Sequence, residues 1–388
     1  MWRHLASNVL TLLIVGLFLV AGLIVWGTQQ YSAAGPLQQA ICLRVESGSN
    51  MRRVSEDLAE LGAISSVSLF RIGADYEEKS NLVKAGAFRV PEGASMDEIV
   101  DLVTGSGQST CGTEVVYRIG VTRTLVEVRE LDPATNRYVE LSEFNPAEEE
   151  PTAEYLAVKE EADTRFRIAL AEGVTSWQVT TGLNALDILD EDLAEIPAEG
   201  SLAPDSYEVT PGASVASVIE RMQEAQVRRL AEAWDGRSEG LPIETPEEAL
   251  ILASIVEKET GVAEERRQVA SVFVNRLNQG MRLQTDPTVI YGVTNGQGVL
   301  GRGLRQSELD RETPYNTYKI NGLPPTPIAN PGLASIEAAL DPDTTEYIFF
   351  VADGTGGHAF ATNLEDHNRN VARWRQIEAE RAAASDEG

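Results

Sequence analysis

The N-terminal part of the chain contains an apolar segment that restricts both its fold and its location. From Asn8 to Gly27 the sequence NVLTLLIVGLFLVAGLIVWG has no charged residue. A stretch of about 20 apolar residues is long enough to cross the hydrocarbon core of a bilayer as an α-helix. Trp2 and Trp26 lie at its two ends, where interfacial aromatic residues are common. We therefore expect a transmembrane helix over residues 8–27.

The charges around this segment predict its orientation. Arg3 is the only positive side chain near the span, so residues 1–7 are expected in the cytoplasm and the rest of the chain outside it. A cleavable signal peptide is the alternative, because Tyr31 to Ala34 offers small residues for cleavage. The apolar segment is long for the core of a signal peptide, which favours an uncleaved anchor.

Composition excludes several functions. The formal net charge of −28 argues against a nucleic-acid partner, since phosphate binding needs clustered Lys and Arg. The three histidines have no metal-binding spacing, and we expect neither a metal nor another cofactor. Cys42 and Cys111 are the only cysteines. An oxidising compartment permits a disulfide between them, and two free buried thiols are the alternative.

The chain outside the span divides into regions of different pattern. The pattern of residues 41–104 predicts the order strand, helix, helix, strand, helix. The sequence GSNMRRVSEDLAELGAI … AGAFRVPEGASMDEIVDLVTGSG in this region resembles a LysM-like domain, which we assign to residues 40–108. Residues 109–164 contain a predicted strand from Val115 to Val128 and then an acidic, solvated excursion. Residues 165–240 form an intermediate segment with a strand at Phe166 and helices from about Ser176 and Val215.

The fourth region, residues 241–380, begins with an unbroken apolar run that ends on an acidic residue. ALILASIVEKET favours a buried helix, with Thr245 as N-cap and Pro246 at its first position; a central strand is the alternative. Glu257 ends the run. A carboxyl at the end of a buried helix is partly desolvated, and this suits a general acid. The alternative is that Glu257 simply begins a solvated segment.

Several motifs follow this run. A helix is predicted from Ala263 to Asn278, and the segment MRLQTDPTVIYG predicts a short helix with Asp286 as N-cap and Gly292 as its end. This turn would bring Gln284, Thr285 and Tyr291 near one point. Next come TPYNTY, the proline-rich loop NGLPPTPIANPG, which suits a rigid wall for an elongated ligand, and a hairpin over FFVADGTGGHAF.

These motifs, in this order and spacing, resemble the YceG-like (MltG) family of endolytic murein transglycosylases. The resemblance implies an α+β catalytic domain that cleaves the β-1,4 bond between N-acetylmuramic acid and N-acetylglucosamine in nascent glycan strands. It implies 1,6-anhydro-muramyl ends as products and termination of strand elongation. Its catalytic glutamate maps onto Glu257, which would donate a proton to the glycosidic oxygen and then accept one from the muramyl 6-hydroxyl. The long segment between Cys111 and Thr164 departs from the simplest form of the family.

The other site residues have weaker assignments. Glu259 lies about 200° around the helix from Glu257, which favours a structural role. Asp286 is the nearest candidate for a second acid, but its predicted role as N-cap explains its presence without catalysis. The expected substrate contacts are Gln284, Thr285, Asp286, Tyr291, Asn316 and Thr317, for each of which a turn or cap hydrogen bond is the alternative.

The resemblance also gives partners and location. It implies peptidoglycan strands as substrate, association with a peptidoglycan synthase, and a single-pass protein of the bacterial inner membrane with a periplasmic catalytic domain. Two other functions stay open: a non-catalytic glycan-binding scaffold of the cell-wall synthesis machinery, and a muramidase-type hydrolase in which water replaces the 6-hydroxyl.

Overall fold

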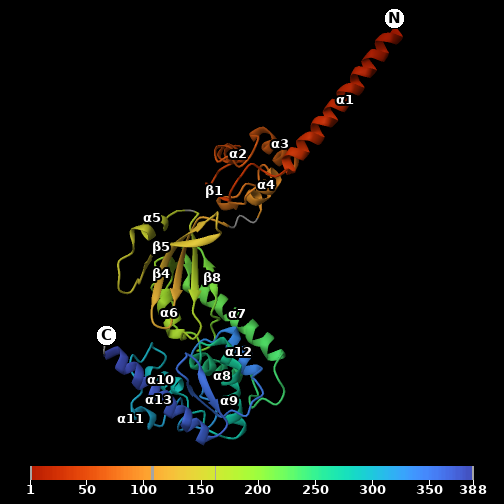
Figure 1. Ribbon diagram of the computed structural model, residues 1–388. Coiled ribbons are helices and arrows are strands. Elements are labelled where there is room, and N and C mark those ends of the chain that lie inside the picture. Colours follow the sequence, from red (N-terminus) through yellow and green to blue (C-terminus); the bar gives the residue numbers. More distant parts are fainter. Residues whose placement is uncertain (1, 106–108, 162, 387–388) are drawn as a thin grey trace. The chain divides into compact units, whose positions relative to one another are not determined.

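The computed structural model describes residues 2–105, 109–161 and 163–386 (Figure 1). The chain divides into two compact units. The first unit comprises residues 1–116, 127–144 and 151–165; the second comprises residues 117–126, 145–150 and 166–388. Helices and strands are mixed along the chain, so the fold class is α+β, as the sequence predicts.

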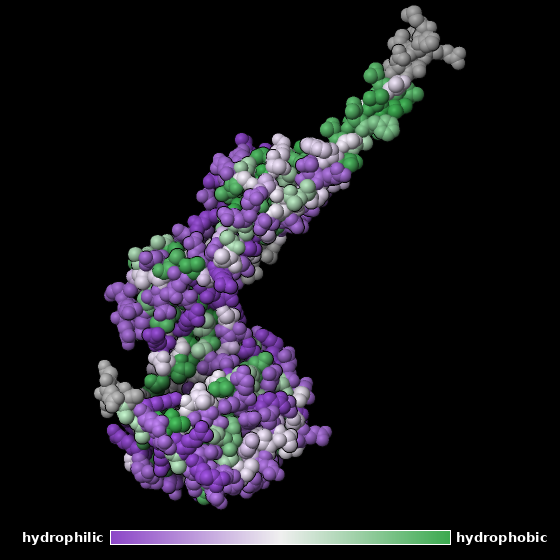
Figure 2. Space-filling model, in the orientation of Figure 1, coloured by the Kyte–Doolittle hydropathy of each residue, from purple (hydrophilic) through white to green (hydrophobic). Residues whose placement is uncertain are grey.

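A single long helix, α1 (Trp2–Ser32), begins the first unit. The most apolar 18-residue window of its segment Leu10–Ser32 has a mean hydropathy of 2.6, and the segment is long and apolar enough to cross a membrane. The apolar side chains of this segment are exposed along the helix (Figure 2). The predicted span is therefore helical and continues beyond Gly27. The side chains of Trp2 and Arg3 lie outside the described residues.

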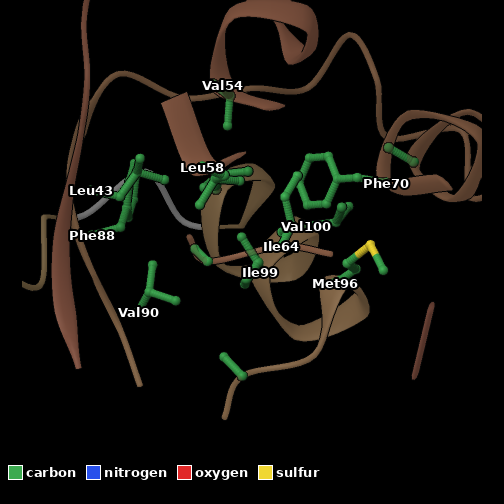
Figure 3. Packing of buried hydrophobic residues seen from close by; sticks show 14 of the residues in the cluster. Leu43, Val54, Leu58, Ile64, Phe70, Phe88, Val90, Met96, Ile99 and Val100 are labelled. Carbon is green, nitrogen blue, oxygen red and sulfur yellow. The ribbon is translucent and has the colours of Figure 1, made fainter. Parts of the chain in front are cut away.

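After α1 the first unit has the predicted order of elements. Strands β1 (Ile41–Val45) and β2 (Gly86–Val90) pair in antiparallel fashion, and helices α2 (Met51–Glu60), α3 (Val67–Tyr76) and α4 (Met96–Thr104) accompany them. Asn50, Ser66 and Ser95 cap the three helices with their side chains. The inward side chains form one apolar core (Figure 3). The likeness to a LysM-like domain stays a prediction.

A disulfide joins Cys42 in β1 to Cys111, with the two Cα atoms 5.8 Å apart. Cys111 is fully buried beside Ala87 and Leu131. The bond therefore ties the β1–β2 pair to the segment that leads into the next strand.

A five-stranded sheet follows, with the strand order β5-β4-β3-β6-β8. Its strands are β3 (Thr113–Ile119), β4 (Thr124–Asp132), β5 (Arg137–Phe144), β6 (Arg165–Leu170) and β8 (Ser206–Val209). The prediction of one strand from Val115 to Val128 was wrong, because a turn closed by the Gly120 N–H and the Arg123 carbonyl (3.1 Å) separates two strands. The acidic segment that follows also contains β5 and the short helix α5 (Ala153–Val158).

The second unit is mainly helical. It contains helices α6 (Ser176–Asn184), α7 (Val215–Asp235), α8 (Pro246–Glu259), η1 (Ala263–Glu265), α9 (Arg266–Asn278), α10 (Asp286–Thr294), α11 (Gln306–Leu309), α12 (Leu333–Leu340) and α13 (Leu364–Asp386). Short strands β7 (Leu189–Asp190) and β9 (Ala213–Ser214) pair in parallel. The predicted hairpin is confirmed as β10 (Phe349–Ala352) and β11 (His358–Ala361). Helices α8, α9 and α12 contribute most of the unit's apolar core.

Candidate active site

Helix α8 carries the predicted acidic motif and lies at the centre of the second unit. Thr245 caps it by accepting a hydrogen bond from the Glu248 N–H (3.2 Å), and Pro246 occupies its first turn, as predicted. Residues 251–256 are all buried, which explains the unbroken apolar run. The helix ends at Glu259, so both acidic residues of the motif lie in its last turn.

The one hydroxyl of the apolar run holds the proline-rich loop in place. Ser254 Oγ donates to the Ile251 carbonyl (2.7 Å) and accepts from the Ile328 N–H (3.0 Å), and Ser254 is fully buried. The loop is thereby anchored directly on the helix that carries the acidic motif.

Replacing Ser254 with alanine should destabilise the protein by about 1–3 kcal/mol, because the Ile328 N–H would lose its partner away from water. Chemical denaturation monitored by tryptophan fluorescence measures this change. Replacing Ser217, an exposed residue of α7 whose hydroxyl also bonds a backbone carbonyl, is the control and should cost far less. An S254A variant as stable as the parent would show that the contact is unimportant.

Glu257 binds the N-terminus of another helix. Its Oε2 accepts hydrogen bonds from the Gly332 N–H (3.0 Å) and from the Ser335 hydroxyl (2.7 Å). Gly332 is the N-cap residue of α12, and a glycine has no side chain with which to cap the helix. A negatively charged group at a helix N-terminus is stabilised by the free N–H groups and the helix dipole. Glu257 therefore acts as an acidic cap for α12.

A third carboxyl, Glu172, lies on the other side of Gly332. A Cβ atom on Gly332 would be 1.8 Å from Glu172 Oε1, so the carboxyl lies directly against the Gly332 backbone. Burial, and then the charge of Glu257, raise the pKa of Glu172. Arg266 lies 3.7 Å from Glu172 and acts in the opposite direction. No sequence motif points to Glu172.

Glu259 has different surroundings. Its carboxyl accepts a hydrogen bond from the Thr285 hydroxyl, and the residue is partly exposed. Desolvation raises the pKa of Glu259, the charge of Asp286 raises it further, and Thr285, His358 and Arg276 lower it. A partly accessible carboxyl that resists ionisation has the properties of a general acid.

The segment Thr285-Asp286-Pro287, called the TDP segment below, supplies the hydrogen-bond partner of Glu259. Thr285, rather than Asp286, is the residue before α10, and the helix continues to Thr294 before Asn295 adopts a left-handed conformation. The predicted boundaries were therefore wrong at both ends: Asp286 is inside the helix, and Gly292 does not end it. The Asp286 carboxylate instead accepts a hydrogen bond from the Tyr318 hydroxyl (2.7 Å).

Three of the expected substrate contacts are buried in hydrogen bonds to the protein. Thr317 Oγ1 accepts from the Thr285 N–H (3.0 Å) and lies 2.9 Å from the Thr288 hydroxyl. Asn316 donates to backbone carbonyls of residues 308, 309 and 311. Thr285, Asn316 and Thr317 are each at most 2% exposed. These contacts hold Thr285 in place, and Thr285 donates to the Glu259 carboxyl.

Thr285 donates to Glu259, whereas Tyr291 contacts a different carboxyl. Its hydroxyl donates to Glu199 Oε2 (3.1 Å), and burial raises the pKa of Glu199. Tyr291 lines a cavity of about 290 Å³ together with Lys258, Ile290 and Ile328. Lys258 is the residue between the two glutamates of the motif, so the cavity adjoins α8 without including either carboxyl.

Gln284 differs from the other candidates because its side chain is exposed and its backbone is left-handed, with φ at +48°. This conformation costs a non-glycine residue roughly 1 kcal/mol or more. Its N–H donates to the Thr317 carbonyl (3.2 Å), which keeps the residue next to Thr285.

Replacing Gln284 with glycine should leave the stability unchanged or raise it by up to about 1 kcal/mol, because glycine adopts a positive φ without strain. The same change should weaken substrate binding if the side chain contacts the glycan, and KM on defined glycan strands measures this. Glu78→Gly, at φ +59° in the first unit, is the control for the backbone effect alone. An unchanged KM in the Gln284 variant would remove this residue from the binding site.

Two further groups surround this site and were not predicted. Arg276 is 7% exposed, and its guanidinium donates to the Ile348 carbonyl (2.6 Å) and to the Leu283 carbonyl. His358 pairs with Glu265 through Nδ1 (2.9 Å), and its N–H also donates to that carboxyl (2.9 Å). An arginine between Phe273 and Leu277 on an apolar helix face is a signal that could have identified Arg276. No cluster of metal-binding side chains occurs among the described residues.

Comparison with known proteins gives a consistent result. The model of the YceG-like family matches residues 43–373. A protein of Streptococcus pneumoniae (strain D39) named endolytic murein transglycosylase is 30% identical over 339 residues, which are 86% of this chain and 58% of that protein. One of the same name from Bacillus subtilis (strain 168) is 29% identical over 328 residues, covering 84% and 82% of the two chains. The chain thus spans just over half the length of its pneumococcal relative.

Among solved structures, a yceG-like protein from Listeria monocytogenes is 25% identical, with a TM-score of 0.46 over 86% of this chain and 99% of that one. The family assignment rests on the family model, which covers most of the chain and includes every motif around the acidic helix. The chain belongs to the YceG-like family.

Proposed function

We propose that this protein is a membrane-anchored endolytic murein transglycosylase and that Glu259 is its general acid. The observation that carries the proposal is the environment of Glu259, a desolvated yet partly accessible carboxyl held by the TDP segment. The names of the relatives support the substrate class, which would be the glycan strands of peptidoglycan.

The proposed reaction uses the Glu259 carboxyl group for proton transfer. The protonated carboxyl would donate to the glycosidic oxygen while the bond from that oxygen to the muramyl anomeric carbon breaks. The 6-hydroxyl of the same sugar would attack the anomeric carbon and return its proton to the carboxylate. An attacking group that is already attached to the sugar needs no second carboxylate to activate water.

Assigning the acid to Glu259 revises the expectation that Glu257 has this role. The sequence predicts a desolvated carboxyl at the end of the apolar helix. Glu257 and Glu259 lie in the same turn, and the sequence does not show how their surroundings differ. The contacts of Glu257 stabilise a carboxylate at the N-terminus of α12. The surroundings of Glu259 favour the protonated form. We therefore propose capping for Glu257 and catalysis for Glu259.

We also propose that α1 anchors the chain in the bacterial inner membrane, with residues 1–7 in the cytoplasm and the chain that follows the anchor outside it. The apolar segment Leu10–Ser32 supports an anchor, and a disulfide supports an oxidising compartment. Association with a peptidoglycan synthase stays a prediction from the family resemblance.

The test is to incubate the purified full chain, in detergent, with uncross-linked glycan strands and to analyse the products by mass spectrometry. We expect shorter strands with 1,6-anhydro-muramyl ends, which are lighter by one water than reducing ends. Reducing ends would indicate a muramidase-type hydrolase instead. Binding of strands without cleavage would indicate a glycan-binding scaffold.

A further inference from the structure

An apolar groove lies in the first unit where α1 meets the folded elements that follow it. The groove has a volume of about 620 Å³. Its apolar lining comes from the last turns of α1 and from α3: Val20, Leu23, Ile24, Trp26, Leu69, Ile72 and Tyr76. The same face of the molecule therefore begins on the candidate membrane span and continues onto a helix of the folded unit.

Close packing fixes α3 against α1. A Cβ atom on Gly73 would lie 2.2 Å from the ring of Tyr31, so the tyrosine lies directly on the backbone of α3. One turn earlier in α1, a Cβ atom on Gly27 would be 3.7 Å from Leu69. These contacts make the end of α1 a part of the folded unit. They support its retention in the mature protein, since removal of α1 would expose the Gly73 surface.

Several large apolar side chains of the groove are exposed to solvent. Ile72 is 63% exposed and Tyr76 is 88% exposed, although both belong to an amphipathic helix whose inner face, Phe70 and Ala74, is fully buried. Trp26 on α1 is 57% exposed. A contiguous apolar surface of this kind indicates an interaction site. Trp and Tyr side chains together are typical of the membrane–water boundary.

Charged residues mark where the groove opens to water. Glu77 and Asp97 are the two acidic residues in its lining. Lys79 lies 2.6 Å from Glu77 and also pairs with Asp101. Such groups remain hydrated at the headgroup level, whereas Ile72 and Trp26 lie on the part of the groove formed by the apolar helices. The surface thus changes from apolar to charged, as an interfacial segment requires.

We propose that this groove is filled by acyl chains of the outer leaflet, so that α3 lies in the membrane interface and seats the first unit on the bilayer. The proposal rests on the anchor proposed above and extends it from a single tether to a helix pair. Continuity with the apolar span identifies lipid, rather than a second protein, as the occupant.

The experiment places single cysteines in the full chain in phosphatidylcholine nanodiscs and labels them with an environment-sensitive fluorophore. The only native cysteines form the disulfide, so an introduced thiol is labelled specifically. The positions are Ile72 and Tyr76 in the groove, Val20 in the span, and Val139, a 54% exposed residue of β5 in the same unit, as control. Quenching by lipid-attached nitroxide and by aqueous iodide is measured for each.

We expect labels at Ile72 and Tyr76 to be quenched by shallow nitroxide lipid, and the label at Val139 to be quenched by iodide alone. Quenching of Ile72 by iodide with Val20 still quenched by lipid would overturn the groove proposal and leave the anchor intact. Protection of Ile72 from both quenchers would indicate that protein, such as a second copy of this chain, covers the groove, and it would also overturn the proposal. Failure of lipid to quench Val20 would refute the anchor itself.

Discussion

Replacing Glu259 with glutamine is expected to lower kcat by about 1,000-fold, because it removes the proton that the leaving oxygen requires. The substitution changes little volume, so the Thr285 contact and the fold should persist. Digestion of glycan strands, followed by quantification of anhydro-muramyl ends, measures the loss.

The same variant should be more stable than the parent at neutral pH. The folded-state pKa of Glu259 is raised, so ionisation above the ordinary glutamate pKa destabilises the folded state as pH rises. Glutamine does not ionise. The gain in Tm should therefore be full above the folded-state pKa and should disappear below about pH 4, where the parent carboxyl is protonated in both states.

Glu257→Gln is the matched control two residues away. It replaces the carboxyl that caps α12 while keeping most of the side-chain volume, so we expect a loss of about 1–2 kcal/mol in stability. Its kcat should change by far less than that of the Glu259 variant. The reverse pattern, with kcat lost at Glu257 and kept at Glu259, would contradict our assignment and restore the one expected from the sequence.

Replacing both Cys42 and Cys111 with serine is expected to destabilise the first unit by about 4 kcal/mol. The bond closes a loop with a sequence separation of 69 residues, and a cross-link of this length removes much conformational freedom from the unfolded chain. Calorimetry is the suitable measurement, since a chain with two compact units need not unfold in one transition.

The transition of the first unit should shift to lower temperature in this variant, whereas glycan cleavage at room temperature should persist, because both glutamates lie in the second unit. Addition of reductant to the parent should reproduce the shift, and its addition to the double variant should have no effect. Equal transitions in the parent with and without reductant would contradict the prediction.

Much of the local structure can be predicted because it depends on neighbours in the sequence. The strand and helix order of residues 41–104, the start of α8 at Pro246 and the β10–β11 hairpin all follow from caps, turns and apolar spacing. The split between β3 and β4 was missed, since the segment around Gly120 lies within a continuous strand-like pattern. Short turns of this kind are decided by strand pairing, which a single segment does not reveal.

The candidate site was predictable in its motifs and not in its contacts. The sequence identified the segments that carry Glu257, Glu259, Thr285 and Asp286, but it could not show that Thr285 is buried or that Tyr291 bonds to Glu199. Arg276 was not predicted to be buried, because a buried guanidinium needs hydrogen-bond acceptors. The carbonyls that accept from it come from other segments of the chain, which the helix sequence alone does not reveal.

Hydrophobic spacing and capping are local properties, and they are enough to predict an apolar helix that ends in two glutamates. The difference between these two carboxyls arises from tertiary contacts. Glu257 meets the N-terminus of α12, which begins more than 70 positions later, and Glu259 meets Thr285. Because charge state depends on burial and on partners that folding brings from afar, the choice between cap and acid is a property of the packed molecule.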